Sequence, residues 1–327
     1  MKKRTVILCL CGFLAFWTFV QSDAAWAAPK FPTKAIKLVV PYKPGGGSDL
    51  SARIFAKHLA KYLPEKVIVA NISGAAGRTA EIEVKRSRPD GYTLLWQHQT
   101  MHMAHATGRS DFDYTAFDAI ASTVKAYSCV VVSKQSPYKT IKGILEAAKA
   151  KPKTIRWGAA INGTSHFAYM AIIDAADIEE GIFHLIGMSG DKNRIVAMLQ
   201  GNMDVSAITL SSVRPYLESG DMKMIGVMAE ERSDAYPNLP TLKEQGVNAI
   251  NRFDYTTWAP KGVDKEIVKI LSEAWIKAAK DPKCQKELKA GWMLPEFLAG
   301  ADLDKFNKDQ LDFFIRLAKK FNLYKKK

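Results

Sequence analysis

The stretch VVPYKPGGGSDLSAR at residues 39–53 joins an apolar run to a helical pattern through two prolines and three consecutive glycines. Apolar residues then recur at the spacing of a helix: Leu50, Ile54, Leu59 and Leu63. Glycines let a guest approach the backbone closely, and the first helical N–H groups lack intrahelical partners. The stretch therefore predicts either an anion-holding turn or an ordinary tight turn, with Ser48 or Asp49 as the helix cap.

The alternation of strand, small-residue turn and helix recurs along the chain. A second turn of this kind spans residues 71–79, and a third spans residues 161–165. Strands are predicted at residues 36–40, 67–70, 92–96, 126–133, 155–160, 183–186, 204–208 and 223–229. Helices are predicted at residues 48–62, 79–86, 140–150, 165–174, 192–200 and 211–219. This order predicts an α/β protein built from two units, each with a mostly parallel sheet flanked by helices and turns at the strand ends.

The last third of the chain has a different pattern. Residues 251–259 read as a strand that crosses between the two units, and beyond Pro260 only helices are predicted. These helices lie at residues 265–280, 282–290 and 302–321. Their apolar faces are typical of helices that pack on a core, so we expect them to cover the free face of the first sheet.

The N-terminus carries an export signal. Lys2, Lys3 and Arg4 precede an apolar run at residues 6–20, and Ala25-Trp26-Ala27 matches a cleavage pattern. The alternative is an uncleaved anchor, but the run is short for a membrane span of about 20 residues. We therefore expect cleavage after Ala27 and a soluble mature protein in the periplasm.

The charge and the cysteines exclude other classes. The net charge is +14, of which residues 1–27 hold +2, so +12 remains on the mature chain. The excess is scattered lysine without the basic, aromatic stripe of a nucleic-acid site, and it favours small anionic partners. Cys129 and Cys284 are too few and too far apart for a disulfide framework, so two free thiols are expected.

Three histidines follow the third strand. His98, His102 and His105 fall within eight residues and invite a metal interpretation. No cysteine or nearby carboxylate completes a zinc set. A polar, pH-sensitive loop at the cleft is the preferred interpretation, and no metal or cofactor is predicted.

A set of motifs in fixed order carries a resemblance. The motifs are Val40-Pro41-Tyr42 with Pro44-Gly45-Gly46 and Asp49, Pro89-Asp90-Gly91-Tyr92-Thr93-Leu94-Leu95, Asn162-Gly163-Thr164-Ser165-His166, Gly201 with Asp204, Pro240-Thr241-Leu242 with Gly246-Val247, and Trp258-Ala259-Pro260-Lys261-Gly262. Along essentially the whole mature chain, the sequence resembles the substrate-binding proteins of tripartite tricarboxylate transporters, the Bug family of periplasmic receptors.

The resemblance implies a two-domain, periplasmic-binding-protein-like (type II) fold with the ligand in the cleft between the domains. It places residues 28–127 and 253–327 in the first domain and residues 128–252 in the second. It further implies a non-enzymatic, monomeric receptor that binds a small carboxylate and delivers it to a two-component membrane permease.

The ligand-binding residues follow from the same resemblance, position by position. They are Tyr42, Gly46, Gly47, Ser48, Asp49, Gly74, Ala75, Ala76, Thr100, His102, Asn162, Gly163, Thr164, Ser165 and Thr209. For Asp49, a plain helix cap is the alternative role. Departures at Ala75-Ala76, Arg78, Gly187-Met188-Ser189-Gly190 and Ile208 leave the ligand open and favour a carboxylate with an apolar or aromatic body.

Two other functions remain open. An exported serine hydrolase would pair Ser48 or Ser165 with His102 or His166, although the chain lacks G-x-S-x-G and Ser165 adjoins His166. A receptor that feeds a sensor protein instead of a transporter is indistinguishable by sequence from a transport receptor.

Overall fold

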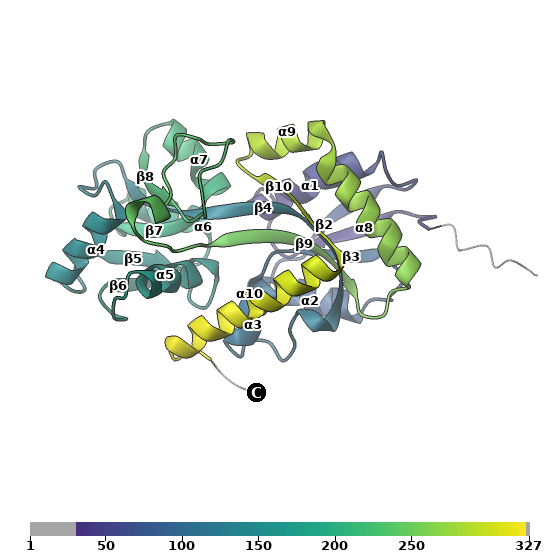
Figure 1. Ribbon diagram of the computed structural model, residues 1–327, viewed down its shortest axis with the longest axis horizontal. Coiled ribbons are helices and arrows are strands. Elements are labelled where there is room, and N and C mark those ends of the chain that lie inside the picture. Colours follow the sequence, from purple (N-terminus) through teal and green to yellow (C-terminus); the bar gives the residue numbers. More distant parts are fainter. Residues whose placement is uncertain (1–30, 325–327) are drawn as a thin grey trace, which may run out of the picture. The chain divides into compact units, whose positions relative to one another are not determined.

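The computed structural model describes residues 31–324, in which ten strands form a continuous mixed sheet. Its first part has the order β2 (Val67–Asn71), β1 (Ile36–Val40), β3 (Thr93–Gln97), β9 (Arg252–Pro260) and β4 (Phe117–Ser133), with β10 (Leu294–Leu298) also on β4. Its second part joins β4 to β7 (Val205–Thr209), β5 (Arg156–Ala159) and β6 (His184–Gly187), with β8 (Met222–Val227) also on β4. Figure 1 shows β4 and β9 running side by side between the two parts.

Strand β4 belongs to both parts because its pairing changes along its 17 residues. From Phe117 to Tyr127 it pairs antiparallel with β9, whereas from Ser128 to Val132 it pairs with β7. We call the structure around the first pairing the first lobe and the structure around the second pairing the second lobe. One unbroken strand thus ties the two lobes together.

Helices cover both faces of each lobe. They are α1 (Gly47–Leu59), α2 (Arg78–Arg86), α3 (Thr100–Ala106), α4 (Ile141–Ala150), α5 (Thr164–Ala175), α6 (Asp191–Leu199), α7 (Leu210–Glu218), α8 (Lys265–Lys280), α9 (Pro282–Ala290) and α10 (Gly300–Lys320). Short helical turns occur at Ala75–Gly77, Tyr114–Ala116 and Lys243–Gln245. The predicted helices and most predicted strands are confirmed within a few residues of their bounds.

The strands bury both faces, as expected for parallel strands between helix layers. In β1, Leu38 packs in the cluster that contains Trp96, whereas Val39 packs on the opposite face with Trp258. In β4, Val130 and Val131 separate in the same way into two clusters. The period of two along each strand therefore places one core on each face of the sheet.

Three elements differ from the sequence prediction. Strand β10 lies where only helix was expected, and it pairs with β4 as a short, irregular strand that contains Pro295. Proline is tolerated there because an edge strand needs no hydrogen bond from that nitrogen. Strand β4 begins at Phe117 rather than at residue 126, and α3 replaces the loop expected at residues 98–105.

The sequence predicted that the last helix covers the first sheet. In the structure it packs on both lobes. Its early part lies near α3, but Phe314 near its end packs 5.1 Å from Phe167 of α5, between ring centroids. Arg316 and Lys320 both form ion pairs with Asp174 of α5. Helix α10 therefore contributes its last turns to the core of the second lobe (Figure 1).

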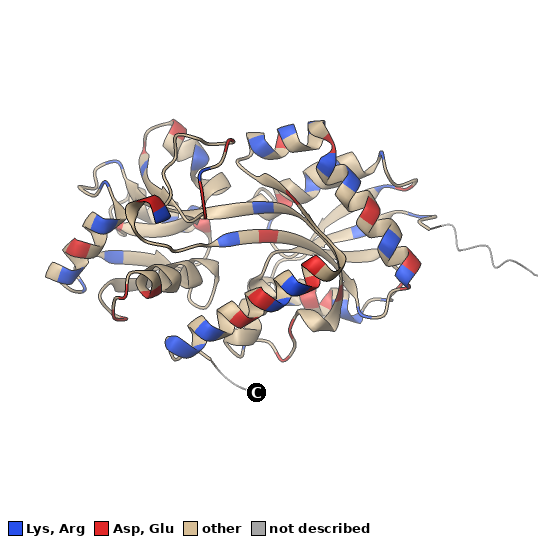
Figure 2. Ribbon diagram, in the orientation of Figure 1, with Lys and Arg blue, Asp and Glu red and all other residues tan. Residues whose placement is uncertain are grey.

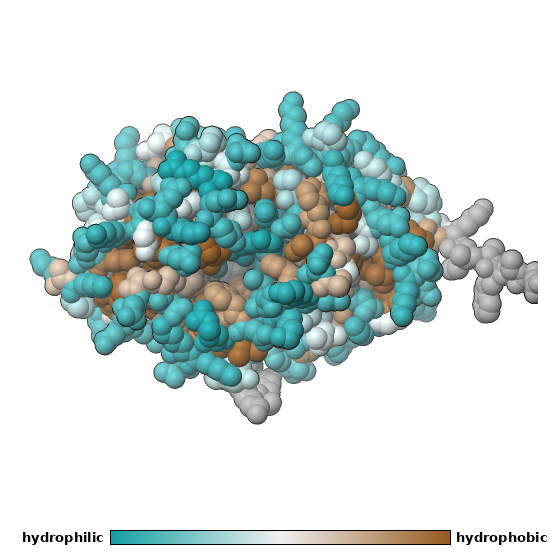
Figure 3. Space-filling view, in the orientation of Figure 1, coloured by the Kyte–Doolittle hydropathy of each residue, from teal (hydrophilic) through white to brown (hydrophobic). Residues whose placement is uncertain are grey.

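The surface carries mixed charge. Lys and Arg are spread over both lobes among Asp and Glu (Figure 2), and apolar patches show between hydrophilic side chains on the face drawn in Figure 3. Within residues 31–324 no helix has both the length and the apolar character needed to cross a membrane. Cys129 and Cys284 are both buried and free. The predicted export signal lies outside the described residues.

Candidate functional site

The first turn, between β1 and α1, is held in shape by Asp49. The Asp49 carboxylate accepts hydrogen bonds from the Gly45 amide at 2.9 Å and the Asn71 amide at 2.9 Å, and it pairs with Arg53. Burial raises the pKa of Asp49, but the bonds from Arg53, Gly45 and Asn71 outweigh it and lower the pKa overall. The Asp49 carboxylate is therefore ionised, and its oxygens are already engaged by groups in and around the first turn.

The start of α1 has no side-chain cap. Gly46 is the N-cap residue and no side chain bonds to the first helical amides, so neither Ser48 nor Asp49 caps the helix. The helices that start at Thr164, Asp191 and Leu210 also lack side-chain caps. By contrast, α4, α8 and α9 are capped by Thr140, Asp264 and Asp281. Uncapped starts leave N–H groups for water or for a ligand.

Two of these uncapped starts, one from each lobe, approach each other. A Cβ placed on Gly47 at the start of α1 would lie 3.1 Å from Ser211 Oγ of α7 and 3.3 Å from the Tyr255 hydroxyl. Burial raises the pKa of Tyr255 to about 12, and the nearby Ser48 side chain opposes that rise. Ser211 Oγ is buried and has no partner within the described chain. Glycine at position 47 thus permits close approach of the two lobes.

Aromatic rings from β9 and from the loop before α3 support this turn. Tyr42 hydroxyl bonds Thr100 Oγ1 at 2.8 Å, and the Tyr42 ring stacks on His98 with centroids 5.5 Å apart. His98 also contacts the edges of Phe253 and Tyr255. Burial lowers the pKa of His98 to about 3, so this ring is neutral at physiological pH. His98 is therefore not a group that changes its charge near neutral pH.

The second turn has an unusual backbone. Gly74, Ala75, Ala76 and Gly77 all have positive φ, at 153°, 44°, 55° and 101°. Alanine in this conformation costs roughly 1–2 kcal/mol per residue. Ala75 and Ala76 line a cavity of about 320 Å³ together with Arg78, Glu81, Ala104 and Arg109. The strained turn thus forms one wall of a cavity in the first lobe.

The third turn belongs to the second lobe and follows β5. Asn162 has a φ of 58°. Its backbone N–H donates to His166 Nδ1, and its backbone carbonyl accepts a hydrogen bond from Arg109 of the first lobe. Ser165 Oγ accepts from the Ala160 amide at 2.8 Å. Gly163 is the N-cap of α5, and Thr164 is half-buried at its first position. Arg109 therefore links the third turn to the cavity beside the second.

Neither proposed serine–histidine pair forms. Ser165 Oγ is occupied by its own turn, as is His166 Nδ1, and burial lowers the pKa of His166 to about 4. The Ser48 side chain lies near Tyr255. His102 stacks on Tyr114 at 4.9 Å and is fully buried. In the described residues, these serines and histidines make no hydrogen bond to one another.

Two residues of the predicted site differ from the rest. His102 lies apart from the three turns, and the backbone amide of Thr209 already has a hydrogen-bond partner. His102 is fully buried under α10, and burial lowers its pKa to about 3. The Thr209 amide donates to Asp191 Oδ2 at 3.1 Å, although its side chain remains half-buried at the start of α7. Across residues 31–324 no group of three His, Cys, Asp or Glu side chains is arranged to hold a metal.

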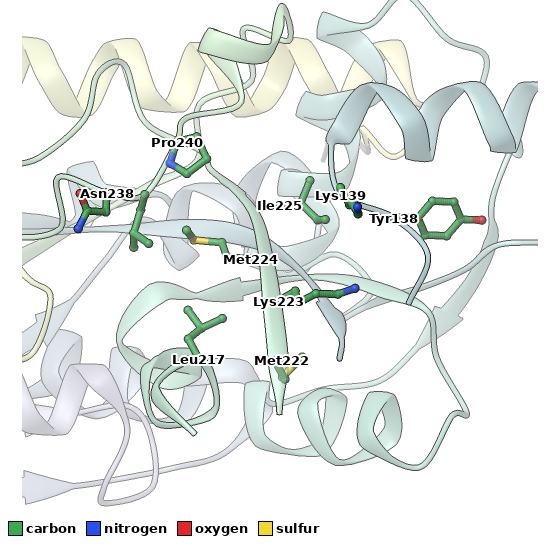
Figure 4. Close-up of a pocket in the computed structure, with 10 residues that line it drawn as sticks. Tyr138, Lys139, Leu217, Met222, Lys223, Met224, Ile225, Asn238 and Pro240 are labelled. Atoms are coloured by element: carbon green, nitrogen blue, oxygen red, sulfur yellow. The ribbon is translucent and has the colours of Figure 1, made fainter. Parts of the chain in front are cut away.

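A larger cavity lies elsewhere, in the second lobe. It has a volume of about 400 Å³ and is lined by β8, by the end of α7 and by the loops around Tyr138 and Pro240 (Figure 4). None of the three turns contributes to it. Of the two cavities, the smaller one is lined by two residues of the predicted binding set, Ala75 and Ala76.

Sequence reasoning did not single out Arg109, Ser211, Tyr255 or Glu81, which the structure places beside these turns. Ser211 is the second residue of α7 and lies two residues after the end of β7, so the same strand-to-helix signal that identified the other turns also covers this residue. Tyr255 lay within the predicted crossing strand but carried no site signal. Arg109 follows a short helix, and its partner Asn162 is 53 residues away in the chain, so no local pattern points to it.

Comparison with known proteins gives a consistent result. Residues 51–323 match the model of the tripartite tricarboxylate transporter family receptor. A Cupriavidus necator protein, "UPF0065 protein in gbd 5'region", is 30% identical over 281 residues, 85% of each chain. The structure of periplasmic binding protein BugD has a TM-score of 0.78, at 26% identity, over 90% of this chain and 100% of that one.

A third relative shares the fold. MatC from Rhodopseudomonas palustris, solved with bound malate, has a TM-score of 0.77 at 23% identity, over 88% of this chain and 99% of that one. The two-lobed α/β architecture is that of periplasmic solute-binding proteins. From its sequence match, its relatives and its fold, this chain belongs to the tripartite tricarboxylate transporter family of receptors.

Proposed function

We propose that this receptor binds a small carboxylate between its two lobes. The observation that carries the proposal is the approach of two uncapped helix starts, Gly47 of α1 and Ser211 of α7, from opposite lobes. Helix N-termini attract anions through unpaired N–H groups and the helix dipole. An anion at this point stabilises the closed arrangement because it is shared by both lobes.

The proposed contacts are those of the three turns. They comprise Tyr42, Gly46, Gly47, Ser48, Gly74, Ala75, Ala76, Thr100, Asn162, Gly163, Thr164, Ser165 and the side chain of Thr209, with Ser211 and Tyr255 added. Asp49 supports the first turn, and His102 supports the packing beneath α10. The two are therefore left out of the proposed contact set.

The family supports the wider setting of the proposal. A receptor of a tripartite transporter delivers its ligand to membrane permease components, and the solved relatives are periplasmic proteins. MatC, a protein of this fold, holds malate, a small dicarboxylate. We propose that this chain works in the periplasm as a monomer. We also propose that residues 28–127 with 253–327, and residues 128–252, are its two domains, with α10 reaching across both.

Calorimetry and thermal shift against carboxylates test the proposal. At a ligand concentration of 100 times Kd, binding stabilises the fold by about 2.7 kcal/mol, which raises the Tm by about 5 °C. The protein is first unfolded, dialysed and refolded to remove carried-over ligand. No binding to mono-, di- or tricarboxylates, amino acids or aromatic acids would contradict the proposal.

A matched pair of variants locates the site. Thr164→Val removes a hydroxyl at the start of α5 and should raise Kd by at least about tenfold, since a lost hydrogen bond to a charged group costs about 1.5–3 kcal/mol. Thr154→Val makes the same change at an exposed position outside the turns and should leave Kd unchanged. Equal effects of the two variants would argue against ligand contact at α5.

A further inference from the structure

A buried arginine lies in α6 of the second lobe. Arg194 is 2% exposed, and its one ion pair within the described residues is with Asp191, three residues earlier in the same helix. Its Nε donates to Ser206 Oγ of β7 at 3.1 Å. A terminal nitrogen donates to the Met188 carbonyl at 3.1 Å, in the turn before α6. Arg194 therefore joins α6 to its preceding turn and to β7.

Asp191 extends this arrangement to the start of α7. Its Oδ1 pairs with Arg194, whereas its Oδ2 accepts a hydrogen bond from the Thr209 amide at 3.1 Å. Thr209 is the N-cap residue of α7. Two residues later, Ser211 Oγ lies 3.1 Å from a Cβ placed on Gly47 of α1. Asp191 thus holds the residue at which α7 begins, next to the contact between the two lobes.

The negative charge of Asp191 acts at this contact. Burial raises the pKa of Tyr255 to about 12, and the charge of Asp191 adds to that rise. The Tyr255 hydroxyl lies 3.3 Å from a Cβ placed on Gly47. Two like charges repel each other over several ångströms inside a protein. A carboxylate in this position therefore disfavours an anionic ligand unless a cation offsets its charge.

Arg194 is the cation that offsets it. Across residues 31–324, no other lysine, arginine or histidine forms an ion pair with Asp191. Burial lowers the pKa of Arg194, and the charge of Asp191 opposes that shift. An arginine remains protonated at neutral pH. The pair therefore has no net charge, which allows a carboxylate to stand in this wall without repelling another.

We propose that Arg194 is a positioning residue that neutralises Asp191, so that a carboxylate can hold the start of α7 within a site that binds an anion. The inference rests on the proposed function, in which the ligand carboxylate lies between the starts of α1 and α7. Arg194 acts through Asp191, whose bond to the Thr209 amide sets the position of the first turn of α7.

Two variants separate neutralisation from packing. Arg194→Met leaves Asp191 without its counter-charge and should raise the Kd of the best-bound carboxylate at least tenfold. Asp191→Asn combined with Arg194→Met removes both charges, while the new amide oxygen can still accept from the Thr209 N–H. This double variant should return Kd to within about threefold of wild type. If Arg194 served packing alone, the double variant would bind no better than Arg194→Met.

The same lobe offers a matched control. Arg156 pairs with Asp204, which also accepts a backbone amide and precedes β7 at the opposite end from Thr209. Arg156→Met should therefore leave Kd within about twofold of wild type. Arg194→Lys keeps the charge and should bind more tightly than Arg194→Met. Calorimetry gives each Kd, and a thermal melt of each ligand-free variant shows that it is folded.

Asp191→Asn alone keeps the proposal testable if Arg194→Met does not fold. The substitution leaves the positive charge of Arg194 without its counter-charge, close to the bound anion. Kd should fall by about threefold or more, even though loss of the ion pair lowers the Tm. In that case, a Kd equal to or above that of wild type would overturn the role of Arg194.

The outcomes separate the two proposals. Three results overturn the role of Arg194 and leave the receptor function standing: a wild-type Kd in Arg194→Met, a double variant as weak as Arg194→Met, or an equal loss in Arg156→Met. Silence of both wild type and Arg156→Met toward every carboxylate overturns the receptor function itself.

Discussion

The first and second turns of the first lobe follow neighbouring parallel strands, yet they are held in different ways. The first turn has three glycines and a buried carboxylate, Asp49, which bonds the Gly45 amide and the side chains of Asn71 and Arg53. The second turn has no equivalent side chain in the described structure. Its backbone closes through the Gly77 amide and the Gly74 carbonyl at 2.8 Å, with two alanines at positive φ.

The comparison teaches that one edge of a sheet can present two turns of different stiffness. Side-chain bonds fix the first turn in the shape that exposes the start of α1. The second turn stores backbone strain, which the surrounding structure must offset. We therefore expect that loss of side-chain contacts or addition of a methyl group at the first turn weakens stability or binding. At the second turn, removal of a methyl group should relieve backbone strain and stabilise the fold.

The largest expected effect is on the first turn. Asp49→Ala leaves the Asn71 amide and the Gly45 amide without their acceptor and should lower the free energy of unfolding by about 2–3 kcal/mol. Chemical denaturation measures the change. Asp234→Ala, at an exposed position, is the control and should change it by less than about 0.5 kcal/mol. Equal losses in both variants would show that Asp49 does not brace the turn.

The next effect is on binding. Gly47→Ala places a methyl group 3.1 Å from Ser211 Oγ and should raise the Kd for carboxylate about tenfold, because overpacking costs about 1–3 kcal/mol. Gly143→Ala is the control, since it adds a methyl group with similar crowding, 3.3 Å from Thr140 Oγ1, in α4 and outside the three turns. Calorimetry compares the two. A Gly47→Ala protein with wild-type Kd would show that the lobes do not need this close approach.

The charge on Asp49 makes stability depend on pH. Burial alone would raise the pKa of Asp49, but its bonds lower it below the unfolded value near 3.9. The resulting stabilisation is complete above about pH 5 and is lost as pH falls through the folded pKa. Thermal melts of wild type and Asp49→Asn between pH 6 and 3 check this. The gap between the two curves should narrow toward pH 3, and parallel curves would contradict the prediction.

The smallest effect is at the second turn. Ala76→Gly removes a methyl group from a residue with a φ of 55° and should raise the free energy of unfolding by about 0.5–1 kcal/mol, since strain relief exceeds the entropy cost of glycine. Ala60→Gly, at a φ of −57°, should lower it by up to about 1 kcal/mol. If both substitutions destabilise, the second turn is not strained.

The first turn and the long helices were predictable from sequence for physical reasons. Three glycines between an apolar run and a helical period identify the first turn, and α8 was predicted at its observed bounds from its amphipathic face. Strand β10 was missed because five residues with an internal proline carry no period. Helix α3 was missed because its histidines suggested a polar loop, whereas His102 is buried in the core.

The site was predictable only in part. Turns at strand ends are local features, so Gly46, Gly47 and Gly163 could be identified by pattern and resemblance. The contact between Arg109 and Asn162 joins two lobes and depends on how β4 and β9 place them, which no local pattern encodes. The sequence also could not show that the Asp49 carboxylate accepts a hydrogen bond from Asn71, because Asn71 lies on β2 and is 22 residues away in the chain.

Strand β9 sits between β3 and β4, so the first sheet is completed only by residues far along the chain. In the order of synthesis, residues 31–133 emerge more than a hundred residues before the strand that joins β3 to β4. A chain whose central pairing is this distant folds slowly, because a long loop must close first. For a chain proposed to leave the cytoplasm, we expect this delay to favour export before the fold is complete.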